Sequence, residues 1–224
     1  MNFLKKRKEK KKIENCLMNK LKLTPEIAKE ILSIKPKTRG IDVRSMADYV
    51  RKKGGEKKLK EVENLLKKVG YPMPYDSLQK IRPYTLGERL IYLSAIKEVL
   101  GWGDDQLEQM GYYVGKNLIL IKFFSHLFKV NKKFVFTVIP KIGSRYMEGL
   151  KIVPVKADIK KRIVTFKIEG LKIKQMGSLK EVERIGLAYF GGFFAGWAQM
   201  VLGKESVKCN AESKKGEYYF TIRW

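Results

Sequence analysis

The chain has 224 residues and a formal net charge of +25, with lysines and arginines spread over both halves. Hydrophobic residues make up 44% of it and aromatic residues 11%, which excludes global disorder and allows a sizeable core. A charge of this sign favours contact with a polyanion such as nucleic acid, although solvated lysine-rich surfaces give the same balance.

The first third of the chain predicts helices. Apolar residues at four-residue spacing predict one from about residue 12 to 21, and Thr24-Pro25-Glu26 is typical of the start of another, which would end near Ser33. Residues 35–40 have the composition of a linker. Two more helices are expected, over residues 44–53 and 56–69, separated by a glycine pair. We therefore expect residues 1–81 to form a basic helical region.

A basic run lies near the N-terminus, before any predicted helix. Such a run could contact the phosphates of a nucleic acid or another polyanion, and it could equally be a solvated terminus. No apolar stretch of sufficient length follows it, so it does not predict a signal peptide. The candidate contact residues are Lys5, Lys6, Arg7, Lys8, Lys10, Lys11 and Lys12.

The middle of the chain predicts two long helices. Thr85 and Glu88 have the spacing of a capping box and open a helix to about Leu100. After a glycine-rich break, Asp104 is expected to cap a helix that ends near Phe128. Residues 131–148 are ambiguous, because their composition suits a strand and their spacing also suits a helix.

The last part of the chain predicts strands around one helix. Alternating apolar residues predict strands over 150–157 and 163–168, joined by a turn. A second pair is expected over 207–211 and 218–224. Between the pairs, Ser178 would cap a helix from about 179 to 202. The sum is an α+β fold whose four antiparallel strands form two hairpins packed with helices, after a helical N-terminal region.

The predicted helix contains nineteen residues without a formal charge, from Ile185 to Gly203. That length is compatible with a membrane span. Five of the nineteen are glycines, which weaken a lipid-facing helix and instead allow a backbone to approach a sheet or another helix closely. Small residues at positions 188, 192, 195 and 196 share one side. We therefore expect no membrane span, but a buried helix against the four-stranded layer.

Residues that carry catalysis or metal binding are scarce. The sequence has no nucleophile elbow, no phosphate-cradling glycine loop and no cluster of metal ligands. The pair Asp104-Asp105 suits a helix start better than acid–base chemistry. Cys16 and Cys209 form no C-x-x-C pair, so reduced thiols and a cytoplasmic location are the simplest expectation. The pattern favours a protein without catalytic activity and without a metal.

Four aromatic residues on the predicted helix could either pack in the core or line an apolar ligand pocket. With the cysteine of the following strand, which is typical of a small buried hydrophobe, they form the candidate pocket: Tyr189, Phe193, Phe194, Trp197 and Cys209.

The C-terminal pattern resembles a known family. It consists of a glycine-rich helix, Gly-Lys, a strand with Lys-Cys, a glycine–acid turn and an aromatic strand, carried by Gly186, Tyr189, Gly192, Ala195, Gly203-Lys204, Lys208-Cys209, Gly216-Glu217 and Phe220. It resembles the 4-vinyl-reductase-type domain, whose superfamily includes haem-NO-binding domains and TRAPP vesicle-tethering subunits. The segment Arg82–Gly115 looks like the lead-in of related proteins, so the resemblance covers residues 82–224.

The resemblance implies an α+β ligand-binding domain that pairs through its helices. It implies a pocket between helices and sheet and a regulatory or sensor role for a small apolar ligand. Zinc-binding members use several cysteines near the last hairpin, where this chain has Cys209 alone. Haem-binding relatives use a proximal histidine. The only histidine here is His126, and a lone histidine is more often a surface or core residue than a ligand. Zinc and haem are therefore not expected.

Two functions from different classes remain. The first is a non-enzymatic, homodimeric small-molecule sensor or regulatory domain. The second is a basic nucleic-acid-associated protein that uses residues 82–224 as a dimerisation scaffold. Clustering of the lysines and arginines of residues 51–60 with the N-terminal basic run on one face would favour the second.

Overall fold

The computed structural model describes residues 21–39, 42–79, 83–117, 144, 147–170, 179–203, 206–214 and 216–224. The helices are α2 (Pro25–Leu32), α3 (Asp42–Lys68), the short 3-10 helix η1 (Tyr75–Ser77), α4 (Leu86–Leu100), α5 (Asp104–Lys116) and α8 (Leu179–Leu202). The strands are β1 (Lys37–Arg39), β2 (Pro83–Thr85), β3 (Met147–Glu148), β4 (Lys151–Asp158), β5 (Ile163–Glu169), β6 (Lys208–Lys214) and β7 (Glu217–Arg223). The predicted α+β class is confirmed.

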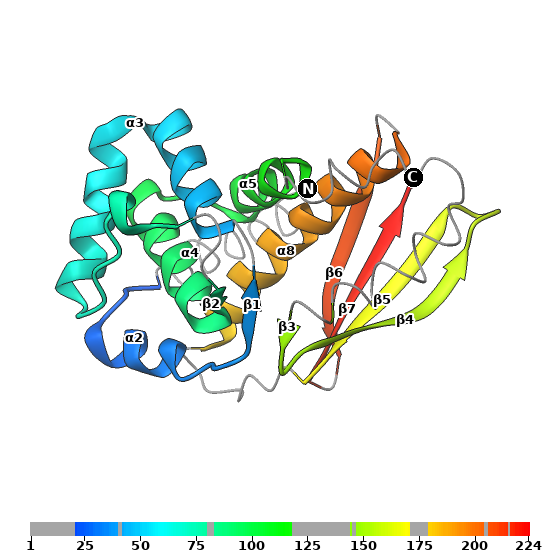
Figure 1. Cartoon of the computed structure of the whole chain (residues 1–224), viewed down its shortest axis with the longest axis horizontal. Helices are drawn as coiled ribbons and strands as arrows, with labels where there is room; N and C mark the ends of the chain where they lie inside the picture. Colours follow the sequence, from blue (N-terminus) through cyan, green and yellow to red (C-terminus); the bar gives the residue numbers. More distant parts are fainter. Residues whose placement is uncertain are drawn as a thin grey trace, which may run out of the picture.

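Figure 1 shows the arrangement of these elements. Helices α2, α3 and α4 gather at one end of the molecule, and the sheet formed by β4 to β7 lies at the other. Helix α8 runs between the two groups, with α5 beside it. The long C-terminal helix is thus shared by both parts.

Local capping explains where the predicted helices begin. The Thr24 side chain accepts a hydrogen bond from the Ile27 amide, and Pro25 occupies the first turn of α2. The capping box of α4 is complete: the Glu88 amide donates to Thr85 Oγ1 at 3.0 Å, and the Thr85 amide donates to Glu88 Oε2 at 2.5 Å. Both starts were predicted correctly.

Two predictions in the helical part need correction. Gly103, not Asp104, is the N-cap of α5, and its amide donates to Gln106 Oε1 at 3.0 Å. The expected linker over residues 35–40 contains strand β1, which pairs antiparallel with β2 and β3 in a small three-stranded sheet. Strand β1 was missed because three residues are too few to show an alternation.

The two helices predicted on either side of the glycine pair are one element with a kink. Helix α3 is interrupted at Gly55, whose φ of 77° lies in the left-handed region that other residues rarely adopt. The predicted break is therefore real, and both flanking segments are helical.

Most of the ambiguous segment 131–148, and the predicted extension of α5 from residue 118 to 128, lie outside the described residues. At the end of the ambiguous segment, Met147 and Glu148 form a strand.

The main sheet has the order β4-β5-β7-β6, with all neighbours antiparallel, so both predicted hairpins are confirmed. The hairpins join at β5 and β7, where Phe166 pairs with Phe220. Strand β4 has a bulge between Pro154 and Lys156. Alternate residues of the two central strands form one buried face: Val164, Phe166, Ile168, Tyr218, Phe220 and Ile222.

Buried side chains form two clusters that meet on α8. The helical core joins the first half of α8 to α2, α3, α4 and α5, and includes Ile31, Met46, Leu90, Met110, Val182, Ile185 and Tyr189. The sheet core joins the second half to the sheet, and includes Val164, Phe166, Phe194, Trp197, Ala198, Phe220 and Ile222. Helix α8 is long and apolar enough to span a membrane by length and composition, and 61% of its most apolar window is buried inside the molecule. The boundary predicted between residues 81 and 82 stays a prediction.

Helices α5 and α8 touch backbone to backbone. A methyl group built on Gly192 would overlap the Glu108 carbonyl oxygen, and one on Gly196 would overlap that of Tyr112. The contact is mutual. Methyl groups built on Gly111 and Gly115 would each overlap a backbone carbonyl oxygen of α8, and these two oxygens lie one helical turn apart. Each helix therefore presents a Gly-x-x-x-Gly pair to the other, and the predicted close approach is made to a helix and not to the sheet.

Gly191, the neighbour of Gly192, faces the sheet. A methyl group there would lie 3.3 Å from Ala211 Cβ, a contact that a small shift relieves. The two adjacent glycines thus have different environments on the same helix, which provides a matched test of the α5–α8 contact.

We expect Gly192→Ala to lower the free energy of unfolding by about 2 kcal/mol, because the added methyl forces the two backbones apart. Gly191→Ala makes the same chemical change, gains helix propensity of up to about 1 kcal/mol and should be neutral or stabilising. Urea unfolding followed by circular dichroism measures both variants. Equal effects of the two substitutions would contradict the backbone contact.

Candidate ligand-binding site

The four predicted aromatic residues form one row along α8. Tyr189 and Phe193 have ring centroids 6.4 Å apart, Phe193 and Phe194 5.7 Å, and Phe194 and Trp197 6.4 Å. The row begins in the helical core with Tyr189 and ends in the sheet core with Trp197. Phe193 is half-buried and packs against both cores. The structure thus brings these residues together along the seam between the two parts.

The second half of the row faces the sheet. The Phe194 ring lies 4.8 Å from that of Phe220, and the Trp197 ring lies 6.5 Å from that of Phe166, centroid to centroid. Both α8 side chains are buried. An apolar ligand held by Phe194 and Trp197 would therefore lie between α8 and the inner face of β5 and β7.

Cys209 is half-buried and packs against the sheet core from strand β6. Burial, reinforced by the nearby Glu108 carboxylate, raises the pKa of the Cys209 thiol to about 12. Burial and Asp105 also raise the pKa of Glu108 above its ordinary value. The sulfur is therefore a protonated, unreactive thiol at neutral pH, which agrees with the expected small hydrophobe and not with a nucleophile.

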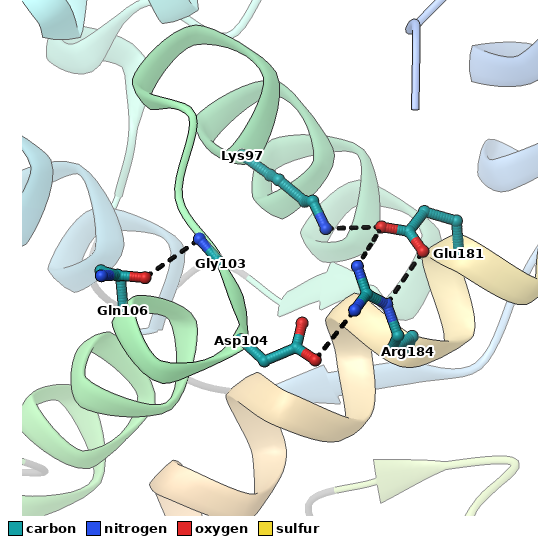
Figure 2. Close-up of polar contacts among 6 residues, drawn as sticks. All are labelled: Lys97, Gly103, Asp104, Gln106, Glu181 and Arg184. Atoms are coloured by element: carbon teal, nitrogen blue, oxygen red, sulfur yellow. Dashed lines mark hydrogen bonds and ion pairs between the residues drawn. The ribbon is translucent and has the colours of Figure 1, made fainter. Parts of the chain in front are cut away.

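A charged network fastens the start of α8 to α4 and α5 (Figure 2). Lys97 Nζ of α4 lies 2.5 Å from Glu181 Oε1, and Arg184 forms two hydrogen bonds with the same carboxylate, at 2.7 and 2.9 Å. Arg184 also reaches Asp104 Oδ2, at the first turn of α5, at 3.0 Å. The start of α8 is thus joined to α4 through Glu181 and to α5 through Arg184.

Burial determines the strength of this network. The Lys97 and Glu181 side chains are only 9% and 17% exposed, so water screens their attraction weakly. Burial alone would raise the pKa of Glu181, but the hydrogen bonds from Arg184 and Lys97 hold it below its ordinary value. Glu181 is therefore ionised at neutral pH and bound to two cations.

Sequence reasoning missed this network. Lys97 was not singled out from the sequence, although a lysine on an almost wholly buried helix indicates that a carboxylate lies opposite. Its partner is 84 residues away, and no local spacing identifies it.

Several predicted site residues lie outside the described part of the chain. These are the whole basic run from Lys5 to Lys12, together with Cys16 and His126. The proposed clustering of the basic run with α3 therefore stays untested. Within α3 itself, acidic residues interrupt the basic ones, and Lys58 is paired with Glu61 at 2.6 Å.

No group of three or more histidine, cysteine, aspartate or glutamate side chains that could hold a metal occurs among the described residues. A haem iron needs an axial ligand, and the described part of the chain contains no histidine. Cys209 is held as a thiol, whereas a cysteine ligand must be a thiolate. The described residues therefore offer a haem iron neither a histidine nor a thiolate, and no step through haem is derived.

Solved structures share this fold. The chain is similar to an Fe(II) unliganded H-NOX protein mutant from K. algicida (16% identity, TM-score 0.50), over 83% of this chain and 95% of that one. A Cs H-NOX mutant carrying 4-cyano-L-phenylalanine gives 15% identity and a TM-score of 0.52, over 83% and 94%. A Tt H-NOX variant gives 16% identity and a TM-score of 0.50, over 83% of this chain and 93% of that one. No family model and no curated protein matches the sequence.

At such low sequence identity, the structural similarity shows a common fold and nothing more. The expected resemblance to haem-NO-binding domains is confirmed at that level, and it extends over 83% of the chain, which is more than residues 82–224 alone make up. The likeness to 4-vinyl-reductase-type domains and TRAPP subunits stays a prediction.

The state of Cys209 can be tested by its reactivity. At pH 8 a pKa of about 12 leaves about a thousandfold less thiolate than the ordinary value of 9.0 does. In a Cys16→Ser variant we expect iodoacetamide to label Cys209 far more slowly than it labels glutathione, and to label it readily after unfolding in urea. Labelling of the native protein at the rate of glutathione would contradict this environment.

The charged network predicts a pH dependence of stability. Because folding lowers the pKa of Glu181 below 4.5, its contribution is complete above that pH and is lost as the pH falls through the folded value. We expect Glu181→Gln to cost about 3 kcal/mol at pH 7, as for one partner of a buried ion pair, and progressively less towards pH 3.

Glu61→Gln is the matched control, because it removes the same charge from the exposed pair with Lys58. It should cost less than about 1 kcal/mol. Denaturant unfolding at several pH values measures both variants. A cost for Glu181→Gln that does not change with pH would contradict the assignment.

Proposed function

We propose that this protein is a non-enzymatic sensor or regulatory domain that binds a small apolar molecule between α8 and the main sheet. The observation that carries the proposal is the aromatic row on α8, which faces both cores and ends against Phe166 and Phe220. The ligand would contact Phe194, Trp197 and Cys209 in the sheet core, and Tyr189 and Phe193 at the seam.

The chemistry of this region supports binding and not catalysis. The side chains that face each other across the layer are aromatic or aliphatic, which suits an apolar ligand. The one nucleophile type among them, Cys209, is kept protonated. Such a site would hold a molecule by burial of apolar surface and would leave it unchanged.

The position of α8 supports a regulatory role. One helix carries aromatic residues that face the sheet, glycines that face α5 and a carboxylate bound by Lys97 of α4. A ligand that moves the second half of α8 would therefore also displace α5, because the backbones touch without intervening side chains. We propose that the domain works as a homodimer and that this displacement is passed to its partner.

Native mass spectrometry of the purified chain tests ligand and assembly together. The expected result is a dimer in which each 26.0 kDa chain carries an additional small mass that disappears on denaturation. Trp197→Phe should weaken the affinity for the ligand by about tenfold, through lost apolar contact of about 1.4 kcal/mol, and so lower the bound fraction.

Trp102→Phe is the matched control, since Trp102 packs on Tyr49 in the helical part, and it should leave the occupancy unchanged. If no adduct is present, a thermal-shift screen of fatty acids, isoprenoids and porphyrins follows. A protein that carries no adduct and is stabilised by none of these compounds would refute the proposal. A monomer with bound ligand would refute only the dimer.

A further inference from the structure

A polar hollow lies in the helical part, away from the aromatic row. It has a volume of about 580 Å³ and is lined by Arg44, Asp48, Arg51, Lys52, Tyr75 and Tyr113. These residues come from α3, η1 and α5, so three elements form its wall. The volume falls within the range of about 300–1,000 Å³ that is usual for small-molecule sites.

The floor of the hollow is held in place by Arg44 and Asp48. Arg44 Nη1 donates to the Tyr75 carbonyl oxygen at 2.5 Å, and its guanidinium stacks on the Tyr75 ring at 3.3 Å from the centroid. The Tyr75 hydroxyl donates to Asp48 Oδ1 at 2.6 Å. Arg44 and Asp48 are therefore engaged mainly with Tyr75 and give the hollow a fixed shape.

Two further cations in the hollow have unused donors. Arg51 lies over the same Tyr75 ring, at 4.6 Å, and its nearest carboxylate oxygen, on Asp48, is 4.0 Å away, beyond hydrogen-bond distance. Lys52 lies over the Tyr113 ring at 5.5 Å and has no acidic partner in the described ranges. Three cations thus face one carboxylate, and an anion would complete the arrangement.

The donors favour phosphate. A guanidinium fork matches two phosphate oxygens, and a neighbouring ammonium adds a point charge, as in many phosphate sites. Inorganic phosphate would fill a small part of the volume, so the rest would hold an organic group beside the Tyr75 and Tyr113 rings. A nucleic acid strand is less suited, since Asp48, Glu56 and Glu61 interrupt the basic residues along α3 and would repel a continuous backbone.

We propose that this hollow binds a small organic phosphate, with Arg51 and Lys52 on the phosphate group and Arg44 and Tyr75 as the rigid support. The inference does not depend on the proposed apolar site, because the two share no residue. It gives the domain a second ligand-binding site, on the helical side of the α5–α8 contact.

Isothermal titration calorimetry with ATP, inorganic pyrophosphate and citrate tests the proposal, at low and at physiological ionic strength. We expect saturable binding of one ATP or pyrophosphate per chain. Arg51→Glu and Lys52→Glu should each weaken it by about tenfold or more. Lys60→Glu makes the same change of charge at an exposed position of α3 outside the hollow, and should alter affinity less than about twofold. Circular dichroism and thermal unfolding confirm that each variant is folded.

Three results would overturn the proposal. If all three variants weakened binding equally, the effect would be one of net charge. If citrate bound as tightly as pyrophosphate, the hollow would not select phosphate. If the phosphates failed to bind while a single-stranded oligonucleotide bound with steep salt dependence and was released by Arg51→Glu, the surface would be a nucleic-acid contact.

Discussion

The structure depends on the contact between the backbones of α5 and α8. Four glycines, at positions 111, 115, 192 and 196, remove the side chains that would otherwise separate the helices. The first half of α8 then packs in the helical core, and its second half packs on the buried face of the sheet. Without this approach, the aromatic row could not face the sheet while the charged start of the helix reached Lys97.

The same contact explains how two proposed sites could influence each other. Helix α5 carries Tyr113, which lines the polar hollow, and Gly111 and Gly115, which touch α8. Helix α8 carries Phe194 and Trp197, which face the sheet. A packed interface without intervening side chains deforms little, so a displacement on one side reaches the other as a movement of a whole helix. The buried ion pair between Lys97 and Glu181 fixes the near end of α8 to α4.

Signals confined to a few neighbouring residues predicted the fold well. The capping box at Thr85 and Glu88 describes bonds between neighbouring residues, and the alternation in the two hairpins marks the face of each strand that is buried, so neither required knowledge of which elements pack together. Local signals could not predict which elements pack against each other. Glycines at 192 and 196 indicate a close approach, but they fit a sheet as well as a helix. Only the repetition of their spacing at 111 and 115 points to α5. The polar hollow was missed because Arg51 and Tyr75 are brought together by the turn after α3, which no periodicity describes.

Native-state hydrogen exchange tests the central contact most directly. If the α5 and α8 backbones support each other, the amides of residues 107–116 and 188–198 should open with the same free energy, equal to that of global unfolding. Exchange from the second half of α8 at a clearly lower free energy, with α5 still protected, would contradict the account, because it would show that the two helices separate without loss of the fold.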